Sequence, residues 1–295
     1  LLQMWGDVVL AAQPGASEKG IEAEFGEVGF WKPVLADDPD VAPAMQELAE
    51  RIPNITEDER HERIARTLVW MRRVFEADRL DVGAIHCWGE FSRFFGFAPC
   101  NFAMASNMAG QPIFCEVDVC HAIMAKLGWA LTDEPPVILD INNNGWDPRV
   151  FNVFHCSQTP NNWMRARACI TGWGSLGGMM APGAFTGISA ATTSDDMCAT
   201  VFQGAFLERT PGERGCSGWA FVPNNQEVLK AIEQGGIHHF VALKGQLGDL
   251  MADALRFRGI NVTDLCCDVP AVSDIEADLP EPGSDEATGY RVYSE

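Results

Sequence analysis

Helical patterns alternate with short apolar strand patterns from residue 41 to residue 155, and this alternation limits the folds open to the chain. Segments 41–53 and 56–77 have helical spacing, and the second begins with the acidic start signal of residues 56–59. The apolar residues that recur at helical spacing in the second segment are Ile64, Leu68, Met71 and Phe75. A helix that leads into an apolar strand is the repeating unit of an α/β domain.

Apolar runs that predict buried strands continue this pattern. They cover residues 82–88, 111–115, 136–140 and 150–155, and a helical pattern at 117–127 separates the second run from the third. In open α/β sheets, functional groups collect at the carboxyl ends of the strands. We therefore expect a parallel-sheet α/β domain over residues 1–170.

The texture of the chain changes after about residue 165. Residues 172–187 are rich in glycine, and alternating patterns at 186–192 and 197–207 predict antiparallel strands. A helical pattern follows at 248–257, and the acidic tail from Asp268 is expected to be irregular. The second expected domain, residues 171–295, is therefore mainly antiparallel β.

Charge and cysteine content restrict the classes of partner. The chain carries 21 basic and 41 acidic residues, a formal net charge of −20, which disfavours nucleic acid and anionic membranes as partners. A neutral or cationic small substrate fits this charge, and so does a merely solvated acidic surface. The ten cysteines form no paired motif, and no run of 18 apolar residues occurs, so we expect a cytoplasmic protein with reduced thiols. The chain begins at Leu1 without a signal region, and we expect it to be part of a longer one.

Metal-competent side chains stand at the ends of the predicted strands. Glu116, Asp140 and His155 each end an apolar run, and His238 and His239 form a pair further along the chain. Hard divalent ions prefer carboxylate oxygens, and Mn²⁺ also accepts imidazole. Taken singly, a strand-end histidine is more often structural and a strand-end aspartate is often a cap. As a set, these residues predict a metal site.

Two stretches of the chain resemble the L-fucose isomerase family. The first, residues 81–160, contains the turn Cys115-Glu116-Val117-Asp118, the strand that ends in Asp140, and the strand Phe154-His155-Cys156. The second runs from Gly236-Ile237-His238-His239 to Gly259-Ile260. The doubled histidine is also similar to the L-arabinose isomerases, whereas fucose-type members have another polar residue at the place of His238.

This resemblance implies a metal-dependent aldose–ketose isomerase that acts on a free sugar. Mn²⁺ or another divalent cation would be held by Glu116, Asp140 and His239, and the two carboxylates would also move a proton between carbons 1 and 2 through an ene-diol. The resemblance also implies a homo-oligomer, and we expect the amino-terminal α/β domain of the family to be missing from the given sequence. A relative that binds sugar without turning it over is the alternative.

Several assignments stay open on the sequence alone. His155 is either a fourth metal ligand or a group that supports one, and His121 is read as a structural residue on a helix face. The residues expected to line the sugar site are Trp88, Asn142, Gln158 and His238. For Trp88, packing in the core is the favoured alternative.

Overall fold

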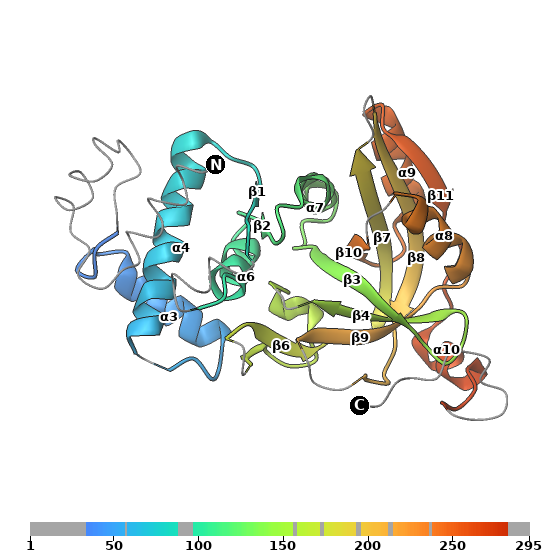
Figure 1. The fold of residues 1–295 in the computed structure, drawn as a ribbon, viewed down its shortest axis with the longest axis horizontal. Coiled ribbons are helices and arrows are strands. Elements are labelled where there is room, and N and C mark those ends of the chain that lie inside the picture. The colour runs from blue at the N-terminus through green and yellow to red at the C-terminus, as the bar shows by residue number, and fades with distance from the viewer. Residues whose placement is uncertain are drawn as a thin grey trace.

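The computed structural model describes residues 34–282, apart from 57, 88–96, 156–157, 172–173, 193–195, 212–214 and 236–237. Its α-helices in this part of the chain are α3 (Val41–Arg51), α4 (Glu59–Asp78), α6 (Cys100–Met108), α7 (Val119–Thr132), α8 (Asn225–Gly235), α9 (Gly248–Phe257) and α10 (Val272–Asp278). Helices α3, α4 and α6 form one side of the molecule, a large sheet forms the other, and α7 lies between them (Figure 1). The helices predicted around residues 41–53, 56–77, 117–127 and 248–257 are confirmed.

Helix α4 illustrates how local sequence determines these elements. Asp58 caps its start by accepting hydrogen bonds from the backbone N–H groups of Arg60 and His61. The four apolar residues predicted for its inner face are buried, with exposures between 0% and 8%. The helix ends at Arg79, which takes a left-handed conformation.

The strands form two sheets. Strands β1 (Gly83–Ala84) and β2 (Ile113–Phe114) make a small parallel sheet. The large sheet has the order β11-β8-β7-β10-β3-β4-β9-β6-β5. Its strands are β3 (Val137–Asn144), β4 (Val150–His155), β5 (Cys169–Ile170), β6 (Leu176–Met179), β7 (Gly183–Thr192), β8 (Met197–Phe206), β9 (Cys216–Phe221), β10 (His239–Lys244) and β11 (Asn261–Leu265). The large sheet is mixed, because β11 pairs with β8 and β6 pairs with β9 in parallel while the other pairs are antiparallel.

The expected parallel sheet over residues 1–170 is wrong for its two longest strands. Strands β3 and β4 pair antiparallel, and only the short β1–β2 pair is parallel in this part of the described chain. The reason is the short connection 145–149, since a parallel pair needs a crossover of a dozen or more residues. Strands from both sides of residue 170 share the large sheet, so the expected domain division does not coincide with a break in it.

Both faces of the large sheet are buried near its centre. In β10, Phe240 and Ala242 join the larger core with the helices of the amino-terminal side, while Val241 and Leu243 pack with α7 and α9. A third cluster forms around Trp146 and α10. Helix α10 corrects the expectation that the chain after Asp268 is irregular; residues 283–295 lie outside the described part.

The sequence expectations about cysteines and membrane spans can be compared with the described residues. All the described cysteines are free thiols. Among the described residues, none of the helices combines the length and apolar character that a membrane span requires.

Candidate metal centre

Strand pairing brings Asp140 and His239 together. The two residues are directly opposite each other in the β3–β10 ladder, and cross-strand partners in an antiparallel pair lie within side-chain contact. The Nε2 atom of His239 lies 2.9 Å from Oδ1 of Asp140. Two residues far apart in the sequence therefore meet because of the strand register.

A strained turn brings Glu116 to the same imidazole. Glu116 and Val117 follow β2 and both take left-handed backbone conformations, with φ values of 62° and 57°. The N–H of Val117 donates to the carbonyl of Ile85, which anchors the turn to the end of β1. Oε2 of Glu116 then lies 3.4 Å from Nε2 of His239. Two of the predicted carboxylates thus face one nitrogen of the predicted histidine.

The charges of this cluster favour a cation at its centre. Burial by itself disfavours a charged imidazole, but the carboxylates of Asp118, Asp140 and Glu116 outweigh it and raise the pKa of His239 to about 11. Burial also opposes the charge on Asp140, yet His155 and His239 hold the pKa of that carboxyl well below its ordinary value. In the protein without an ion, a proton on His239 supplies the positive charge that the carboxylates attract.

The geometry fits a hard divalent ion. His239 Nε2 and Asp140 Oδ1 are buried, and neither has an aligned hydrogen-bond partner among the described residues. Buried polar atoms without partners are uncommon and point to a missing ligand. Neighbouring ligands of an octahedral ion at about 2.0–2.1 Å lie about 3 Å apart, close to the separations around Nε2. One ligand atom each from Asp140, His238 and His239 lies within 4.8 Å of the others, with His239 buried and Asp140 partly buried, so an Asp/His cluster able to hold an ion is present.

Two further predicted residues flank Asp140. His155 Nδ1 lies 3.3 Å from Oδ2 of Asp140, the oxygen that does not contact His239, and its own Nε2 is buried without a hydrogen-bond partner among the described residues. Burial opposes a charge on His155, and Asp140 raises its pKa nevertheless. His238 is mainly exposed, with Nε2 4.0 Å from Oδ1 of Asp140. His155 therefore supports the carboxylate, whereas His238 lies at the open side of the cluster.

The residues expected to line a sugar site are less concentrated. Asn142 is exposed and lies at an irregularity in the β3–β4 pairing between Ile141 and Asn143. Gln158 is fully buried, and neither atom of its side-chain amide has a hydrogen-bond partner among the described residues. Trp88 lies outside the described residues.

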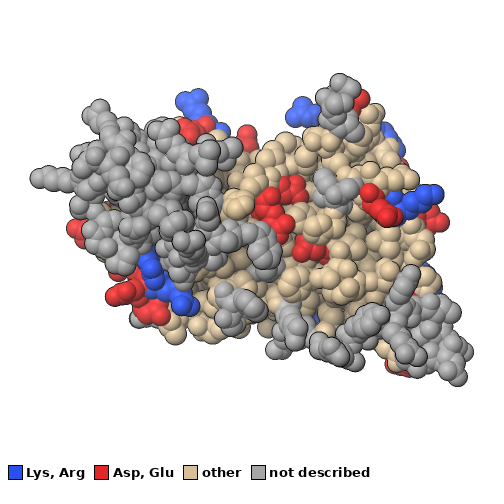
Figure 2. Space-filling view, viewed as in Figure 1, with Lys and Arg blue, Asp and Glu red and all other residues tan. Residues whose placement is uncertain are grey.

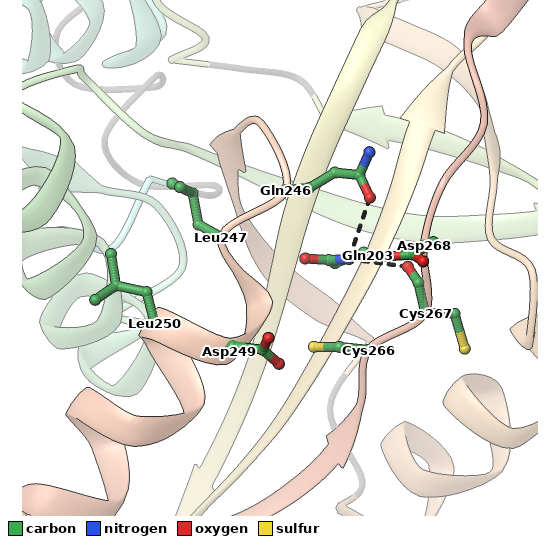
Figure 3. Close-up of a pocket in the computed structure, with 8 residues that line it drawn as sticks. All are labelled: Gln203, Gln246, Leu247, Asp249, Leu250, Cys266, Cys267 and Asp268. Carbon is green, nitrogen blue, oxygen red and sulfur yellow. Dashed lines mark hydrogen bonds between the residues drawn. The ribbon is translucent and has the colours of Figure 1, made fainter.

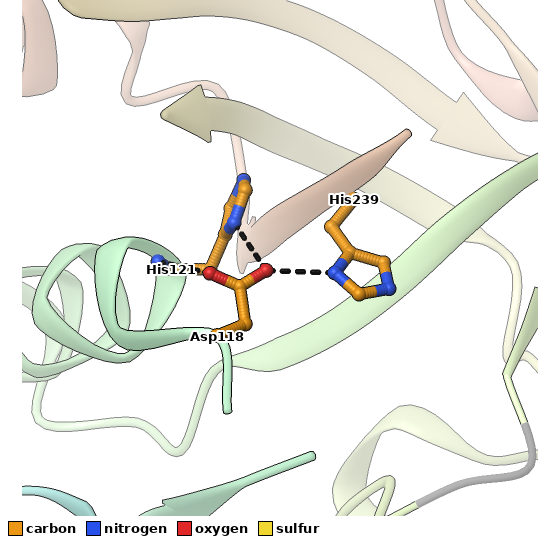
Figure 4. Close-up of side chains that lie close together, drawn as sticks. All are labelled: Asp118, His121 and His239. Atoms are coloured by element: carbon orange, nitrogen blue, oxygen red, sulfur yellow. Dashed lines mark hydrogen bonds and ion pairs between the residues drawn. The ribbon is translucent and has the colours of Figure 1, made fainter. Parts of the chain in front are cut away.

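Asp118 and His121 belong to the cluster, although sequence reasoning did not assign them to it. Both His121 Nδ1 and His239 Nδ1 lie 2.7 Å from the same Asp118 oxygen, Oδ2 (Figure 4). Burial opposes the charge on Asp118, but its hydrogen bonds with the two histidines hold its pKa well below the ordinary value. The available signal was the spacing Asp118-x-x-His121, which brings an N-cap carboxylate next to a histidine of the first helical turn.

The molecular surface shows the same concentration of negative charge. Acidic side chains gather near the middle of the face seen in Figure 2, between the helical part and the large sheet, while the described Lys and Arg side chains lie toward the periphery of that face. An anionic surface of this kind attracts cations and repels phosphates.

A separate pocket of about 340 Å³ opens beside the start of α9 (Figure 3). Two glutamines in its wall bond the protein itself: Gln203 donates to the carbonyl of Cys267, and Gln246 donates to the carbonyl of Val269. The amide groups in its wall are therefore engaged in holding the segment after β11, and we assign the pocket no function.

No protein-family model matches the sequence, and no curated protein matches it. Support for a function therefore comes from the residues of the cluster and from the resemblance of the sequence motifs.

Proposed function

We propose that this chain carries the active centre of a divalent-metal-dependent aldose–ketose isomerase that acts on a free sugar of the L-fucose or L-arabinose type. The observation that carries the proposal is the convergence of Glu116 and Asp140 on Nε2 of a buried histidine, His239. The resemblance of the motifs around these residues to the L-fucose isomerases supports the same reaction.

In this proposal, Glu116, Asp140 and His239 hold Mn²⁺ or another divalent cation. The ion would act as a Lewis acid that stabilises negative charge on the sugar oxygens. Glu116 has a side chain that is 25% exposed, and that of Asp140 is 16% exposed, so both border an accessible site. These two carboxylates would remove a proton from one carbon of the sugar and return it to the neighbouring carbon. His155 holds the far oxygen of Asp140 and so fixes the direction of that carboxylate.

The proposed partners are a small neutral sugar and further copies of the chain in a homo-oligomer, in the cytoplasm. Oligomerisation and location depend on the family resemblance alone. Sedimentation of the active protein tests the assembly, and an active monomer would rule it out.

The first experiment concerns the ion. Equilibrium dialysis with Mn²⁺ should give about one site per chain at neutral pH, and Glu116→Gln should weaken binding, because it removes one anionic oxygen ligand. The matched control is Glu227→Gln, which makes the same charge change at an exposed position on α8. Absence of Mn²⁺ binding by the parent protein would refute the metal centre.

The second experiment concerns the proton transfer. In heavy water, isomerisation should place deuterium on carbon 1 or carbon 2 of the sugar. The reason is that the proton taken from the sugar can exchange with solvent while a carboxyl group holds it. Loss of a general base lowers the rate by roughly 10²–10⁴-fold, so Glu116→Gln should lose turnover while Glu227→Gln keeps it. Metal content is measured in the same samples, because Glu116 has two proposed roles.

Two outcomes would change the assignment. A metal-loaded Glu116→Gln protein that isomerises sugar at the parental rate would remove Glu116 as the base. A metal-loaded parent that binds sugar but neither labels nor converts any pentose, hexose or deoxyhexose would favour the sugar-binding alternative.

A further inference from the structure

One carboxylate holds two histidines beside the proposed metal centre. Asp118 Oδ2 lies 2.7 Å from Nδ1 of His121 and 2.7 Å from Nδ1 of His239, while Oδ1 accepts the backbone N–H of His121 at 3.0 Å. His121 and His239 are 0% and 4% exposed. Water is thus largely excluded from the two histidines that share this carboxylate.

A backbone group of β7 determines the proton arrangement of His121. The backbone N–H of Ala190 donates to Nε2 of His121 at 3.0 Å. A backbone amide can only donate, so Nε2 must be an unprotonated acceptor, and the ring proton must be on Nδ1. His121 therefore donates to Asp118, and the chain of hydrogen bonds has one direction from β7 to the carboxylate.

The same reasoning extends to His239. Asp118 is an ionised acceptor, so Nδ1 of His239 must carry the proton that it donates to Oδ2. This leaves Nε2 of His239 as the nitrogen that faces Glu116 and Asp140. An imidazole held by a carboxylate at one nitrogen is a better ligand through the other, and its ring orientation is fixed.

We infer that Asp118 is the positioning residue of the metal centre, fixed in turn by His121 and the Ala190 amide, and that it directs His239 to bind the ion through Nε2. This inference rests on the proposed metal centre. Asp118, His121 and His239 also bring ligand atoms within 4.8 Å of one another. The Ala190 hydrogen bond and the two 2.7 Å contacts of Asp118 Oδ2 already engage those atoms in hydrogen bonds. We therefore expect one ion site, at Nε2 of His239, and not a second one at His121.

Asp118→Asn tests the positioning role. Asparagine caps a helix start as well as aspartate does, so α7 should still begin at Val119. The neutral amide is a weaker hydrogen-bond acceptor for the two histidines than the carboxylate, because it lacks the negative charge. Loss of such a carboxylate costs about 10–100-fold in metal affinity, and we expect that loss for Mn²⁺ in equilibrium dialysis. The matched control is Asp133→Asn at the other, exposed end of α7, where the charge change is the same and asparagine suits the left-handed backbone.

Two substitutions at His121 test the second link. His121→Phe removes both ring hydrogen bonds and should weaken Mn²⁺ binding, with one site per chain retained. His121→Asn keeps a donor near Asp118 and should restore part of the affinity. Mn²⁺ affinities of Asp118→Asn and His121→Phe equal to that of the Asp133→Asn control would overturn the inference. So would two Mn²⁺ sites in the parent and one in His121→Phe.

A spectroscopic measurement separates this inference from the proposed function. Nitrogen-15 NMR of the histidine rings in the metal-free parent should show His121 neutral, with its proton on Nδ1. Loading with diamagnetic Zn²⁺ should shift Nε2 of His239 and leave both His121 nitrogens nearly unchanged. Two results would disprove this chain of hydrogen bonds: a proton on Nε2 of His121, or a His121 nitrogen signal that shifts on Zn²⁺ loading as a metal ligand does. The metal-free result is informative even if the chain has no isomerase activity.

Discussion

Val117 has a backbone conformation that is unfavourable for its side chain. A β-branched residue in the left-handed region is a genuine outlier, and Val117 has a φ of 57° immediately after Glu116 at 62°. Such conformations cost about 1–3 kcal/mol each and collect at functional sites. The turn places Glu116 and Asp118 at opposite nitrogens of His239, which gives the unfavourable backbone a structural purpose.

Replacing Val117 by glycine should separate stability from metal binding. Relief of a left-handed β-branched residue is worth about 1–2 kcal/mol and exceeds the entropic cost of glycine, about 0.5–1 kcal/mol. We expect Val117→Gly to raise the free energy of unfolding by up to about 1 kcal/mol in urea titrations. Mn²⁺ affinity should fall roughly tenfold. This is the lower end of the 10–100-fold loss seen when the groups that orient a metal ligand are disturbed.

Val119→Gly provides the comparison for this prediction. Val119 is exposed and opens α7, where glycine lowers stability by up to about 1 kcal/mol. The two glycine variants should therefore change stability in opposite directions. A loss of stability in both would show that the turn is relaxed in solution.

Some residues of the candidate metal centre could be predicted from the sequence, and others could not. Glu116 and Asp140 could be predicted because each stands at the end of an apolar run in the sequence, where a carboxylate needs a reason to be present. Asp118 could not be assigned from the sequence, because an aspartate before a helix is an ordinary cap, which it also is. The sequence places His121 on a helix face, which predicts a structural residue, and its hydrogen bond to Asp118 becomes visible only in three dimensions.

At the scale of elements, α7 packs closely against β10 at Gly128. A Cβ atom at Gly128 would come within 2.3 Å of Leu243, a buried residue of β10. Helix α7 carries His121 and β10 carries His239. This close approach therefore sets the distance between the two histidines that share the Asp118 carboxylate.

Gly128→Ala should move these two elements apart. Overpacking costs about 1–3 kcal/mol, which outweighs the helix propensity that alanine restores, about 1 kcal/mol. We expect thermal unfolding to show a net loss of up to about 2 kcal/mol, together with weaker Mn²⁺ binding. In a double-mutant cycle, Gly128→Ala should be less harmful in a Leu243→Ala background, because the clashing side chain is gone. Simple additivity would show that the clash is absorbed elsewhere.

The connection between β3 and β4 contains a carboxylate, Asp147, that should make the stability of the protein depend on pH. Asp147 is buried and accepts hydrogen bonds from the backbone N–H and the side chain of Arg149. Burial opposes its charge, but these bonds lower its pKa below the ordinary value. A lowered folded pKa stabilises the protein above the unfolded pKa, near 3.8, and this contribution disappears as pH falls through the folded value.

Asp147→Asn should therefore destabilise the protein by about 1.5–3 kcal/mol at pH 7. The difference from the parent should shrink as the pH is lowered below about 4. Urea unfolding of parent and variant at several pH values measures it, with Asp133→Asn as the control of equal charge change. A pH-independent difference would contradict the assigned ion pair.

The elements themselves were easier to predict than their directions. The apolar run at 150–155 predicted β4 at its observed position, whereas β3 extends to Asn144, so the expectation that the strand ends at Asp140 is wrong. Strand direction is not encoded in such short apolar runs, which look alike in parallel and antiparallel sheets when both faces are buried. The five-position connection at 145–149 was the available evidence, since it permits a hairpin and excludes a crossover.

At the scale of the whole molecule, the net charge of −20 should make stability depend on salt. Self-repulsion destabilises a compact acidic protein, and added ions screen it. We expect the thermal midpoint at pH 7 to rise between about 20 mM and about 500 mM NaCl. Near pH 4.6, the isoelectric point of the sequence, the same change of salt should have little effect. An equal salt response at both pH values would indicate specific ion binding instead of screening.

The position of β10 in the large sheet determines when the proposed metal centre could form during synthesis. Strand β10 fills the place between β3 and β7, yet it is made after both of them, so β3 and β7 each expose an unpaired edge until the ribosome has passed Lys244. Exposed edges are templates for wrong pairing, and a nascent chain that stops earlier cannot hold the ion through His239. Metal loading would therefore stabilise only chains whose translation has continued past β10.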